Sequence, residues 1–573
     1  MNTLSNLNRP VQNWLGLLLA LPVLLATPSP LRAADPWTPL ANPAPDSVNL
    51  MLLLSDGTVM AQQTGGSNWY RLTPINGRYT NGIWSTMPPM NDARVFYSSA
   101  VLRDGRLFVA GGEYGTGGAK AEIFDPQANQ WTQIPVPAAL LNPALGEGFL
   151  DSSCKILPDG KLLVAPVAAN TFAGTLIYDP VANSWTNGPA SLAWLAEATW
   201  LKLADDSILT VDPDSQNSER YIPALNQWVT DTNVPVRLYV PLPGYVGEIG
   251  GAALLADGRA FFLGGDGKTA LYTPSGNNSP GTWAAGPDVP KDPQGNSQGA
   301  PDAPAAMMVN GKVLCLVSRP AYVDGAGQVQ FPSPSRFYEY DPIANAFTSV
   351  KAPHGDTENV IPFTTAMLAL PDGNILFSER SSQLYVYRPD GPPLPAGKPT
   401  ITRITMNRDT SYHLTGTKLN GISEGASYGD DAQMDSNYPL VRLDDGAGHI
   451  YYGRTYNWSS TSVQTGSQPV STEFMVHEGL PPSLYSLVAV ANGIASDPVS
   501  FFGPMWVDFN YTGVSQTGNF FSPFKTLSQG RDNVLPSGTI LIKGNSSTAE
   551  TLTINKPMTL GASGGPATIG RFP

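Results

Sequence analysis

The sequence predicts an all-β protein whose larger part is a seven-bladed β-propeller. A unit returns at intervals of about fifty residues between Asp56 and Gly391, a period typical of propellers. Each unit holds an Asp-Gly-like turn between two apolar runs, and most units end in an aromatic pair of fixed spacing. Each unit is therefore expected to form one blade of four antiparallel strands.

The turn dipeptide sets the number of blades. An Asp-Gly pair between apolar runs is a strong hairpin signal, because both residues tolerate the left-handed backbone of a tight turn. The turns are Asp56-Gly57, Asp104-Gly105, Asp159-Gly160, Asp205-Asp206, Asp257-Gly258, Asn310-Gly311 and Asp372-Gly373. Seven turns predict seven blades.

Aromatic pairs mark the outer half of the unit. The pairs are Phe124/Trp131, Tyr178/Trp185, Tyr221/Trp228 and Tyr340/Phe347, with a longer turn in Tyr272/Trp283. Unrelated hairpins of a β-sandwich would not keep these aromatics in register with the turns, so we interpret them as packing residues between blades. The segment from Trp37 to Leu40 is expected to supply the outer strand of the last blade and leave no free edge.

Changes in composition divide the rest of the chain. The predicted parts are a signal peptide at 1–34, the propeller at 35–391, a Pro-rich linker at 392–399, an immunoglobulin-like (E-set) β-sandwich at 400–503 and a short β-helix-like segment at 504–573. Prolines keep the linker out of any central strand. The last segment holds too few turns for an isolated β-helix, so it packs on the preceding domain, pairs with another chain, or is a remnant.

The first residues resemble a cleaved secretory signal. Arg9 precedes an apolar stretch from Trp14 to Ala26, and small residues follow at Ala33-Ala34. The stretch is shorter than the ~20 residues that a membrane span needs, and no other segment approaches that length. The protein is therefore expected to be secreted or to stay at the cell surface, with no integral span in the mature chain.

Charge and cysteine content exclude some classes of partner and scaffold. The net charge is −13 without long charged runs, which argues against nucleic acid and anionic membrane as partners. Cys154 and Cys315 are the only cysteines, so the fold does not depend on a disulfide framework. Two buried free thiols are expected.

The turns, the Gly111-Gly112 pair and the aromatic spacing are the pattern of kelch repeats. Its best local match is the run from Arg94 to Ala100 before Asp104-Gly105. A seven-bladed kelch propeller followed by an immunoglobulin-like domain resembles the galactose oxidase and glyoxal oxidase family. The resemblance covers Asp46 to Phe502 and implies a copper ion held by two tyrosines and two histidines, one tyrosine being linked to a cysteine by a thioether.

The positions that match those copper ligands hold other residues. The family's Tyr-His pair falls on Phe363 and Thr364, and its cross-linked tyrosine falls on Phe96 or Glu197. Cys154 lies where the cross-linked cysteine is placed, but without an opposed tyrosine it is interpreted as a small core residue.

The histidines do not suggest a copper site either. They are His354, His413, His449 and His477. The resemblance implies a fourth ligand from the second domain, but the region around Thr455 to Trp458 holds no histidine. No cofactor and no metal site are therefore predicted. Copper enters only under the alternative of an oxidase with relocated ligands.

Acidic residues leave two further possibilities. Asp430, Asp431 and Asp435 offer oxygen ligands for Ca²⁺, although turn chemistry explains this run equally well. A hydrolase or lyase also stays open, because the sequence does not show which of its carboxylates share a cleft. The candidate acids are Asp151, Glu197, Glu248, Asp266 and Glu379.

The preferred function is that of a non-catalytic kelch propeller that binds an extracellular glycan or protein. The ligand is expected on the face formed by the loops after the second and fourth strands of each blade. The candidate ligand-binding residues there are Tyr114, Trp194, Tyr245, Tyr322 and His354. A structural, adhesin-like role is a further alternative, and the oligomeric state is not indicated.

Overall fold

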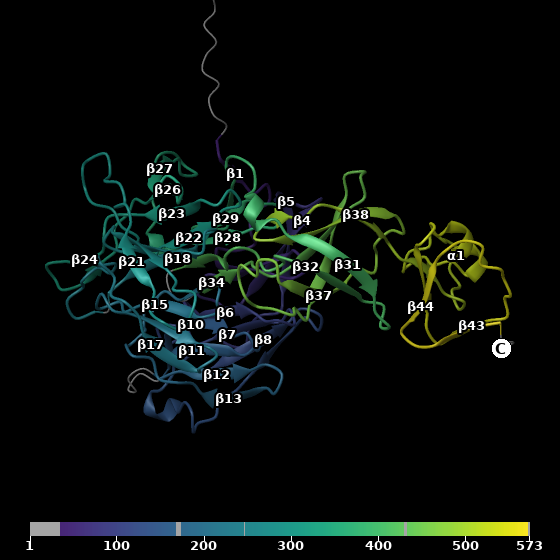
Figure 1. Cartoon of the computed structure of the whole chain (residues 1–573), viewed down its shortest axis with the longest axis horizontal. Helices are drawn as coiled ribbons and strands as arrows, with labels where there is room; N and C mark the ends of the chain where they lie inside the picture. The colour runs from purple at the N-terminus through teal and green to yellow at the C-terminus, as the bar shows by residue number, and fades with distance from the viewer. Residues whose placement is uncertain (1–34, 168–173, 246, 429–431, 571–573) are drawn as a thin grey trace, which may run out of the picture. The chain divides into compact units, whose positions relative to one another are not determined.

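The predicted seven-bladed propeller is confirmed. The computed structural model describes residues 35–167, 174–245, 247–428 and 432–570, so the expected leader lies outside the described residues. Six four-stranded antiparallel sheets and one six-stranded sheet make up the seven blades. Figure 1 shows one of them in the neighbouring strands β10 to β13.

Each of the first six blades takes its strands in chain order, from the first, inner strand to the fourth, outer one. Blades one and two are β2 (Val48–Leu53), β3 (Val59–Gln63), β4 (Trp69–Ile75), β5 (Arg78–Met87) and β6 (Ser98–Val101), β7 (Leu107–Ala110), β8 (Ala121–Asp125), β9 (Gln130–Gln133). Blades three and four are β10 (Phe149–Ile156), β11 (Leu162–Val167), β12 (Leu176–Asp179), β13 (Ser184–Asn187) and β14 (Leu201–Lys202), β15 (Ile208–Val211), β16 (Ser218–Ile222), β17 (Gln227–Thr230).

Blades five to seven continue the pattern. They are β18 (Ile249–Leu254), β19 (Ala260–Gly264), β20 (Thr269–Thr273), β21 (Thr282–Ala285); β22 (Pro304–Met307), β23 (Val313–Val317), β26 (Arg336–Asp341), β27 (Ala346–Val350); and β28 (Ala366–Ala369), β29 (Ile375–Ser378), β30 (Tyr385–Tyr387) with β1 (Trp37–Pro39). A small hairpin, β24 (Tyr322–Val323) with β25 (Val329–Gln330), interrupts blade six. Short 3₁₀ turns occur at Pro143–Leu145, Pro362–Thr364 and Pro395–Gly397.

The turn dipeptides work as the sequence predicts. In blade two the Asp104 carboxylate accepts from the backbone N–H of Arg106 at 3.0 Å, and the same bond recurs in the other six blades. The second turn position has a positive φ, 85° at Gly105 and 66° at Asp206. An Asp or Asn before a Gly satisfies both needs, because its side chain caps the turn that Gly permits.

The predicted aromatic pairs lie directly opposite each other on the third and fourth strands, as Tyr178 and Trp185 do. Their ring centroids are 4.8 Å apart in that pair. The Tyr178 hydroxyl also donates to the side chain of Asn183 at 2.8 Å, and Asn183 has a φ of 49°. The aromatic pair therefore fixes the outer hairpin as well as the packing between blades.

The ring closes as predicted from the sequence. Residues Trp37 to Pro39 pair antiparallel with β30, so the two ends of the repeat share blade seven. The Trp37 ring lies 4.8 Å from Phe337 in blade six and 5.5 Å from Phe377 in blade seven, between ring centroids. Its indole N–H donates to the Lys351 carbonyl at 2.6 Å.

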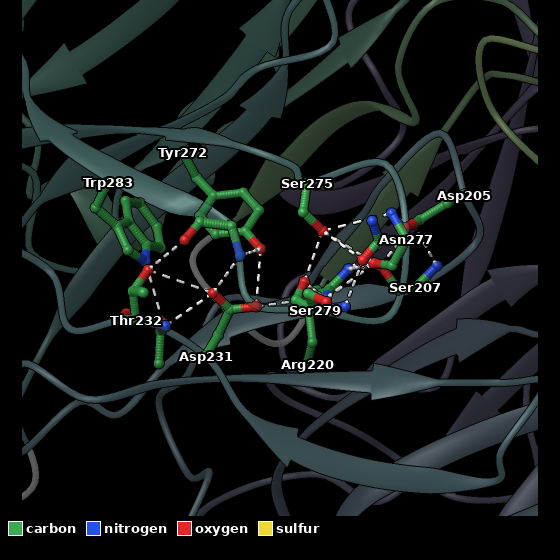
Figure 2. A network of polar contacts seen from close by, with 12 residues as sticks. Asp205, Ser207, Arg220, Asp231, Thr232, Tyr272, Ser275, Asn277, Ser279 and Trp283 are labelled. Atoms are coloured by element: carbon green, nitrogen blue, oxygen red, sulfur yellow. Dashed lines mark hydrogen bonds and ion pairs between the residues drawn. The ribbon is translucent and has the colours of Figure 1, made fainter.

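Buried polar networks also join neighbouring blades. Figure 2 shows Arg220 of blade four, whose guanidinium donates to Asp231 at 2.9 Å and to the Ser279 carbonyl at 2.7 Å. Asp231 also accepts from the Tyr272 hydroxyl of blade five at 2.8 Å. Because Arg220 and Asp231 are both fully buried, each must be satisfied by such partners.

The second domain is all-β, as expected. Its strands are β31 (Thr400–Met406), β32 (Tyr412–Thr417), β33 (Gly425–Tyr428), β34 (Ala432–Asp435), β35 (Leu440–Asp444), β36 (Ile450–Tyr456), β37 (Pro469–Met475), β38 (Leu484–Ala491), β39 (Ile494–Ala495) and β40 (Val499–Phe502). Eight of them form antiparallel sheets around one apolar core that includes Leu414, Val441, Phe474 and Leu487.

The remaining two strands of this domain join the propeller. Strands β33 and β34 form a hairpin whose β33 pairs with β22, the inner strand of blade six. At its base Glu424 accepts from the Lys155 ammonium of blade three at 2.6 Å. The resemblance placed the second domain's ligand in the region around Thr455 to Trp458. The segment that pairs with an inner strand is this hairpin instead.

The C-terminal segment contains the expected parallel strands. Strand β42 (Thr539–Lys543) pairs in parallel with β41 (Met505–Val507) and β44 (Thr559–Ser563), and β43 (Ser546–Thr548) pairs with β45 (Ala567–Ile569). One helix, α1 (Leu527–Asn533), is capped by Thr526 and packs its Leu527 into the same core. Among the described residues no helix is long and apolar enough to cross a membrane.

Candidate functional sites

The inner strands bring one sequence position of four blades together. First strands of neighbouring blades contact one another, as β6 and β10 do, so residues near their starts lie around the centre of the ring. Counted eight residues before the turn, this position holds Phe96, Asp151, Glu197 and Asp302 in blades two, three, four and six. All four have a positive φ, between 39° and 58°. The shared backbone conformation shows that these residues are structurally equivalent.

Three of these residues belong to a group of five acids, here named the central carboxylate cluster: Glu113, Asp151, Glu197, Glu248 and Asp302. Carboxylate oxygens of Glu113, Asp151 and Glu197 lie within 4.8 Å of one another, and those of Glu197, Glu248 and Asp302 do as well. Burial raises the pKa of Asp151, and a hydrogen bond with Glu113 partly offsets this.

Aromatic rings lie beside this cluster, and the predicted Tyr114 is one of them. The Tyr114 side chain is 80% exposed, and its ring centroid lies 6.1 Å from that of Phe96. Phe96 also contacts Phe363, and the Arg380 guanidinium lies 4.8 Å from the Phe96 ring centroid. The centre of this face therefore combines acids on one side with aromatic rings and a cation on the other.

The predicted Trp194 lines a separate groove of about 410 Å³ on blade four, here named the Trp194 groove. The other lining residues are Leu192, Ala193, Asp212, Asp214, Asn217, Ser218, Glu219 and Thr230. Glu219 accepts from the backbone N–H groups of Leu192 at 2.8 Å and Ala193 at 3.1 Å, which holds the loop that carries Trp194. Burial raises the pKa of Glu219 to about 7.

The remaining predicted residues lie elsewhere. Tyr245 is half-exposed on the loop before blade five, and Tyr322 is half-exposed on β24 of the small hairpin in blade six. The Tyr245 hydroxyl donates to the Gly327 carbonyl at 3.4 Å. His354 follows the last strand of blade six and contacts Glu358 and Tyr385. The five predicted residues thus line no single pocket among the described residues.

The residues at the family's copper positions do not fit copper. Phe363 packs between Phe96 and Phe331 and has no ligand atom. The Thr364 hydroxyl donates to the Ile361 carbonyl at 2.7 Å. Cys154 is 1% exposed in an apolar cluster, where its thiol lies 3.5 Å from the Ser99 carbonyl. Neither a tyrosine and histidine pair nor a tyrosine for the thioether stands at these positions.

The other histidines and acids are placed as follows. His413 contacts Glu473 and His449 contacts Asp445, both in the second domain. Asp266 pairs with Arg237 and is not part of the central carboxylate cluster. Of the predicted calcium ligands, Asp430 and Asp431 lie outside the described residues. Burial raises the pKa of Asp435, and the charges of Lys155 and Lys202 act in the opposite direction.

The sequence held a signal for the central carboxylate cluster. The resemblance uses the count of eight residues before the turn in blades two and four only. Applied to every blade, the same count identifies Asp151, Glu197 and Asp302 together. Glu113 and Glu248 lie at other positions, so this count does not find them. Their approach depends on ring closure, which brings loops of different blades together.

The comparisons with known proteins agree with the repeat. A model of the Kelch motif matches residues 94–135. An F-box/kelch-repeat protein of Arabidopsis thaliana is 26% identical over 164 residues, which are 25% of this chain and 34% of that protein. A galactose oxidase of Gibberella zeae is 32% identical over 93 residues, 16% of this chain and 13% of the oxidase. The matches thus span about a third of the plant protein and about an eighth of the oxidase.

Two solved structures align with more than half of this chain at low sequence identity. A fungal alcohol oxidase of the AA5 family, solved in complex with copper, is 15% identical with a TM-score of 0.49, covering 82% of this chain and 98% of that one. Virginiamycin B lyase from Staphylococcus aureus is 11% identical with a TM-score of 0.41, covering 61% and 98%. With the repeat and the blades described above, the chain is a kelch propeller related to galactose oxidase.

Proposed function

We propose that this protein is a non-catalytic extracellular kelch propeller that binds a glycan in the Trp194 groove. The observation that carries the proposal is the composition of that groove, which sets an indole beside Asp212, Asp214 and Asn217 in a volume of about 410 Å³. This volume lies within the range of ordinary small-ligand sites.

The groove offers the two kinds of contact that a sugar needs. An indole provides a flat apolar surface for the C–H face of a pyranose ring, and carboxylate and amide oxygens accept hydrogen bonds from its hydroxyl groups. Three of the lining residues, Asp212, Asp214 and Glu219, are acids, and none of the described residues that line the groove is basic. This charge favours neutral or amine-bearing sugars over uronic or sulfated ones.

The loop that carries Trp194 is fixed before a ligand arrives. Glu219 is 3% exposed and bonds two successive backbone N–H groups of that loop. A binding residue that is already ordered loses less conformational entropy on binding. The predicted leader and the net charge of −13 support an extracellular setting.

A glycan array followed by calorimetry tests the proposal. The array should show binding to neutral or amino glycans, and Trp194→Ala should weaken the affinity about 10- to 100-fold, as loss of an aromatic anchor does. Asp214→Asn, which keeps the shape of the side chain, should weaken it less. Tyr322→Ala, on another blade, is the matched control and should bind normally. Binding that survives Trp194→Ala, or an array without any retained glycan, would contradict the proposal.

A second candidate function is acid–base catalysis at the central carboxylate cluster. It is favoured by the raised pKa of Asp151, because a partly buried carboxyl group next to other carboxylates can act as a general acid. This candidate predicts that the glycans that bind gain new reducing ends. Their formation should be lost in Asp151→Asn but kept in Trp194→Ala at high glycan concentration. This result would favour catalysis over simple binding.

A further inference from the structure

His354, Glu358 and Glu379 form a group of three possible ligands at the junction of blades six and seven. One ligand atom of each lies within 4.8 Å of the other two. His354 and Glu358 come from the connection between β27 and β28, and Glu379 follows β29. None of the three belongs to the Trp194 groove or to the central carboxylate cluster.

The imidazole is oriented by contacts on both of its nitrogens. His354 Nδ1 lies 2.9 Å from each carboxylate oxygen of Glu358, and Nε2 lies 2.8 Å from the Tyr385 hydroxyl. The Glu358 side chain is 6% exposed, whereas that of His354 is 53% exposed. Nδ1 therefore points at the Glu358 carboxylate, and the imidazole stays open to solvent.

The two carboxyl groups are also in contact with each other. Burial and then the charge of Glu358 raise the pKa of Glu379 to about 7, and a hydrogen bond with Glu358 adds to this. The hydrogen bond with Glu358 raises the pKa of His354. The three side chains therefore lie close enough together to bind one ion.

We propose that His354, Glu358 and Glu379 bind a divalent transition-metal ion, Zn²⁺ in the first place. One imidazole nitrogen and two carboxylates are ligands that Zn²⁺ accepts, and three protein ligands with an open position are the pattern of zinc sites that keep a water or substrate. A hard ion such as Ca²⁺ is less suited, because it takes six to eight oxygen ligands and no imidazole.

Tyr385 acts as the positioning residue of this site. A histidine that binds a metal through one nitrogen usually donates from the other to a fixed partner. When Nδ1 takes the metal, Nε2 carries the proton and donates to the Tyr385 oxygen. Metal ions bind the deprotonated forms of imidazole and carboxylate, so metal binding at this site competes with protons.

The backbone holds His354 and Glu358 in place without the metal. Glu358 exchanges two backbone hydrogen bonds with Ser335, at 2.8 and 2.9 Å, and Ala352 exchanges two with Gly355 on either side of His354. Glu379 lies two strands beyond these two residues in the sequence, so the positions of the histidines alone do not reveal the group.

Isothermal titration calorimetry with Zn²⁺ on the purified, metal-free protein tests the proposal. We expect one high-affinity site whose binding releases protons, seen as a heat that changes with the ionisation enthalpy of the buffer. Tyr385→Phe should weaken binding about 10- to 100-fold, as loss of an outer partner does, and His354→Ala should weaken it more.

Two variants serve as controls. His449 also faces a carboxylate four residues away, with Nδ1 2.7 Å from Asp445. Among the described residues it belongs to no group of three possible ligands, so His449→Ala should leave the affinity unchanged. Glu197→Gln, in the central carboxylate cluster, should also leave it unchanged. The proposal is overturned if no Zn²⁺ binds, if His354→Ala binds normally, or if Glu197→Gln abolishes the binding in its place.

Discussion

The ammonium of Lys155 and the carboxylate of Glu424 form a buried ion pair, 2.6 Å apart, between an inner strand of the propeller and the base of the second-domain hairpin. The side chain of Lys155 is fully buried and that of Glu424 is 8% exposed. Burial acts to lower the pKa of Lys155, but the charges of Glu424 and Asp435 raise it above its usual value. Lys155 therefore stays charged, and its contact with Glu424 ties the two domains together.

Removing one partner of this pair should destabilise the protein strongly. Lys155→Met leaves Glu424 buried without its cation, and such a change costs about 3–5 kcal/mol of unfolding free energy. Urea denaturation monitored by tryptophan fluorescence measures it. Lys161, which forms an exposed pair with Asp159, is the matched control, and Lys161→Met should cost less than about 1 kcal/mol. Equal effects of the two variants would contradict this account.

The outer strand β1 closes the ring, and its Trp37 should carry much of that closure. Trp37 is 5% exposed and packs on rings from blades six and seven. Trp37→Ala should lower the unfolding free energy by about 3–5 kcal/mol, the usual cost of removing a buried aromatic ring. Ile343→Ala, at a residue 93% exposed, should change it by less than about 0.5 kcal/mol. A stable Trp37→Ala variant would show that ring closure does not depend on this strand.

The repeat was predictable because its signals are local. The turn before Gly105 is made by neighbouring residues, and the Tyr178/Trp185 pair spans one hairpin, so short segments of sequence determine both. The closing strand from Trp37 was also predictable, since a propeller without it would leave an edge. These features need no knowledge of how distant blades meet.

The sites were less predictable because they depend on contacts between distant segments. Asp151, Glu197 and Asp302 come together only when the inner strands surround the centre, and His354 meets Glu379 only across two blades. The hairpin at β33 and β34 pairs with β22, more than 100 residues earlier in the chain. No local pattern in the second domain marks that pairing.

The stability of the protein should fall as the pH rises from about 4.5 to 7. Burial raises the pKa of Glu219 to about 7, so the folded state keeps a proton that the unfolded state has released over this interval. The unfolding free energy then decreases by up to about 1.4 kcal/mol per pH unit for this proton and levels off above pH 7. The raised pKa of Glu379 acts in the same direction.

Urea denaturation at pH 5, 6, 7 and 8 measures this dependence. Glu219→Gln has no ionisable group at this position, so its slope between pH 5 and 7 should be smaller than that of the unsubstituted protein, whatever its absolute stability. A stability that stays level or rises over this interval would show that Glu219 ionises normally in the folded protein.

Both cysteines should remain unmodified and unreactive in the folded protein. Cys154 is 1% exposed and Cys315 is fully buried, and burial raises the pKa of Cys154 to about 12. At pH 8 only on the order of one Cys154 in ten thousand is then a thiolate, the form that reacts with disulfide reagents. Ellman's reagent should find no fast-reacting thiol in the native protein and two in the unfolded one.

The same cysteine tests the loss of the copper-radical site. After incubation with Cu²⁺ and oxygen, the peptide that holds Cys154 should keep the mass of a free thiol, because no tyrosine stands at the family's cross-link position, where Phe96 or Glu197 is found. Mass spectrometry of the digest measures this. A cross-linked peptide two hydrogens lighter than the sum of Cys154 and tyrosine peptides would show that a thioether forms, and the oxidase alternative would then replace the binding function proposed here.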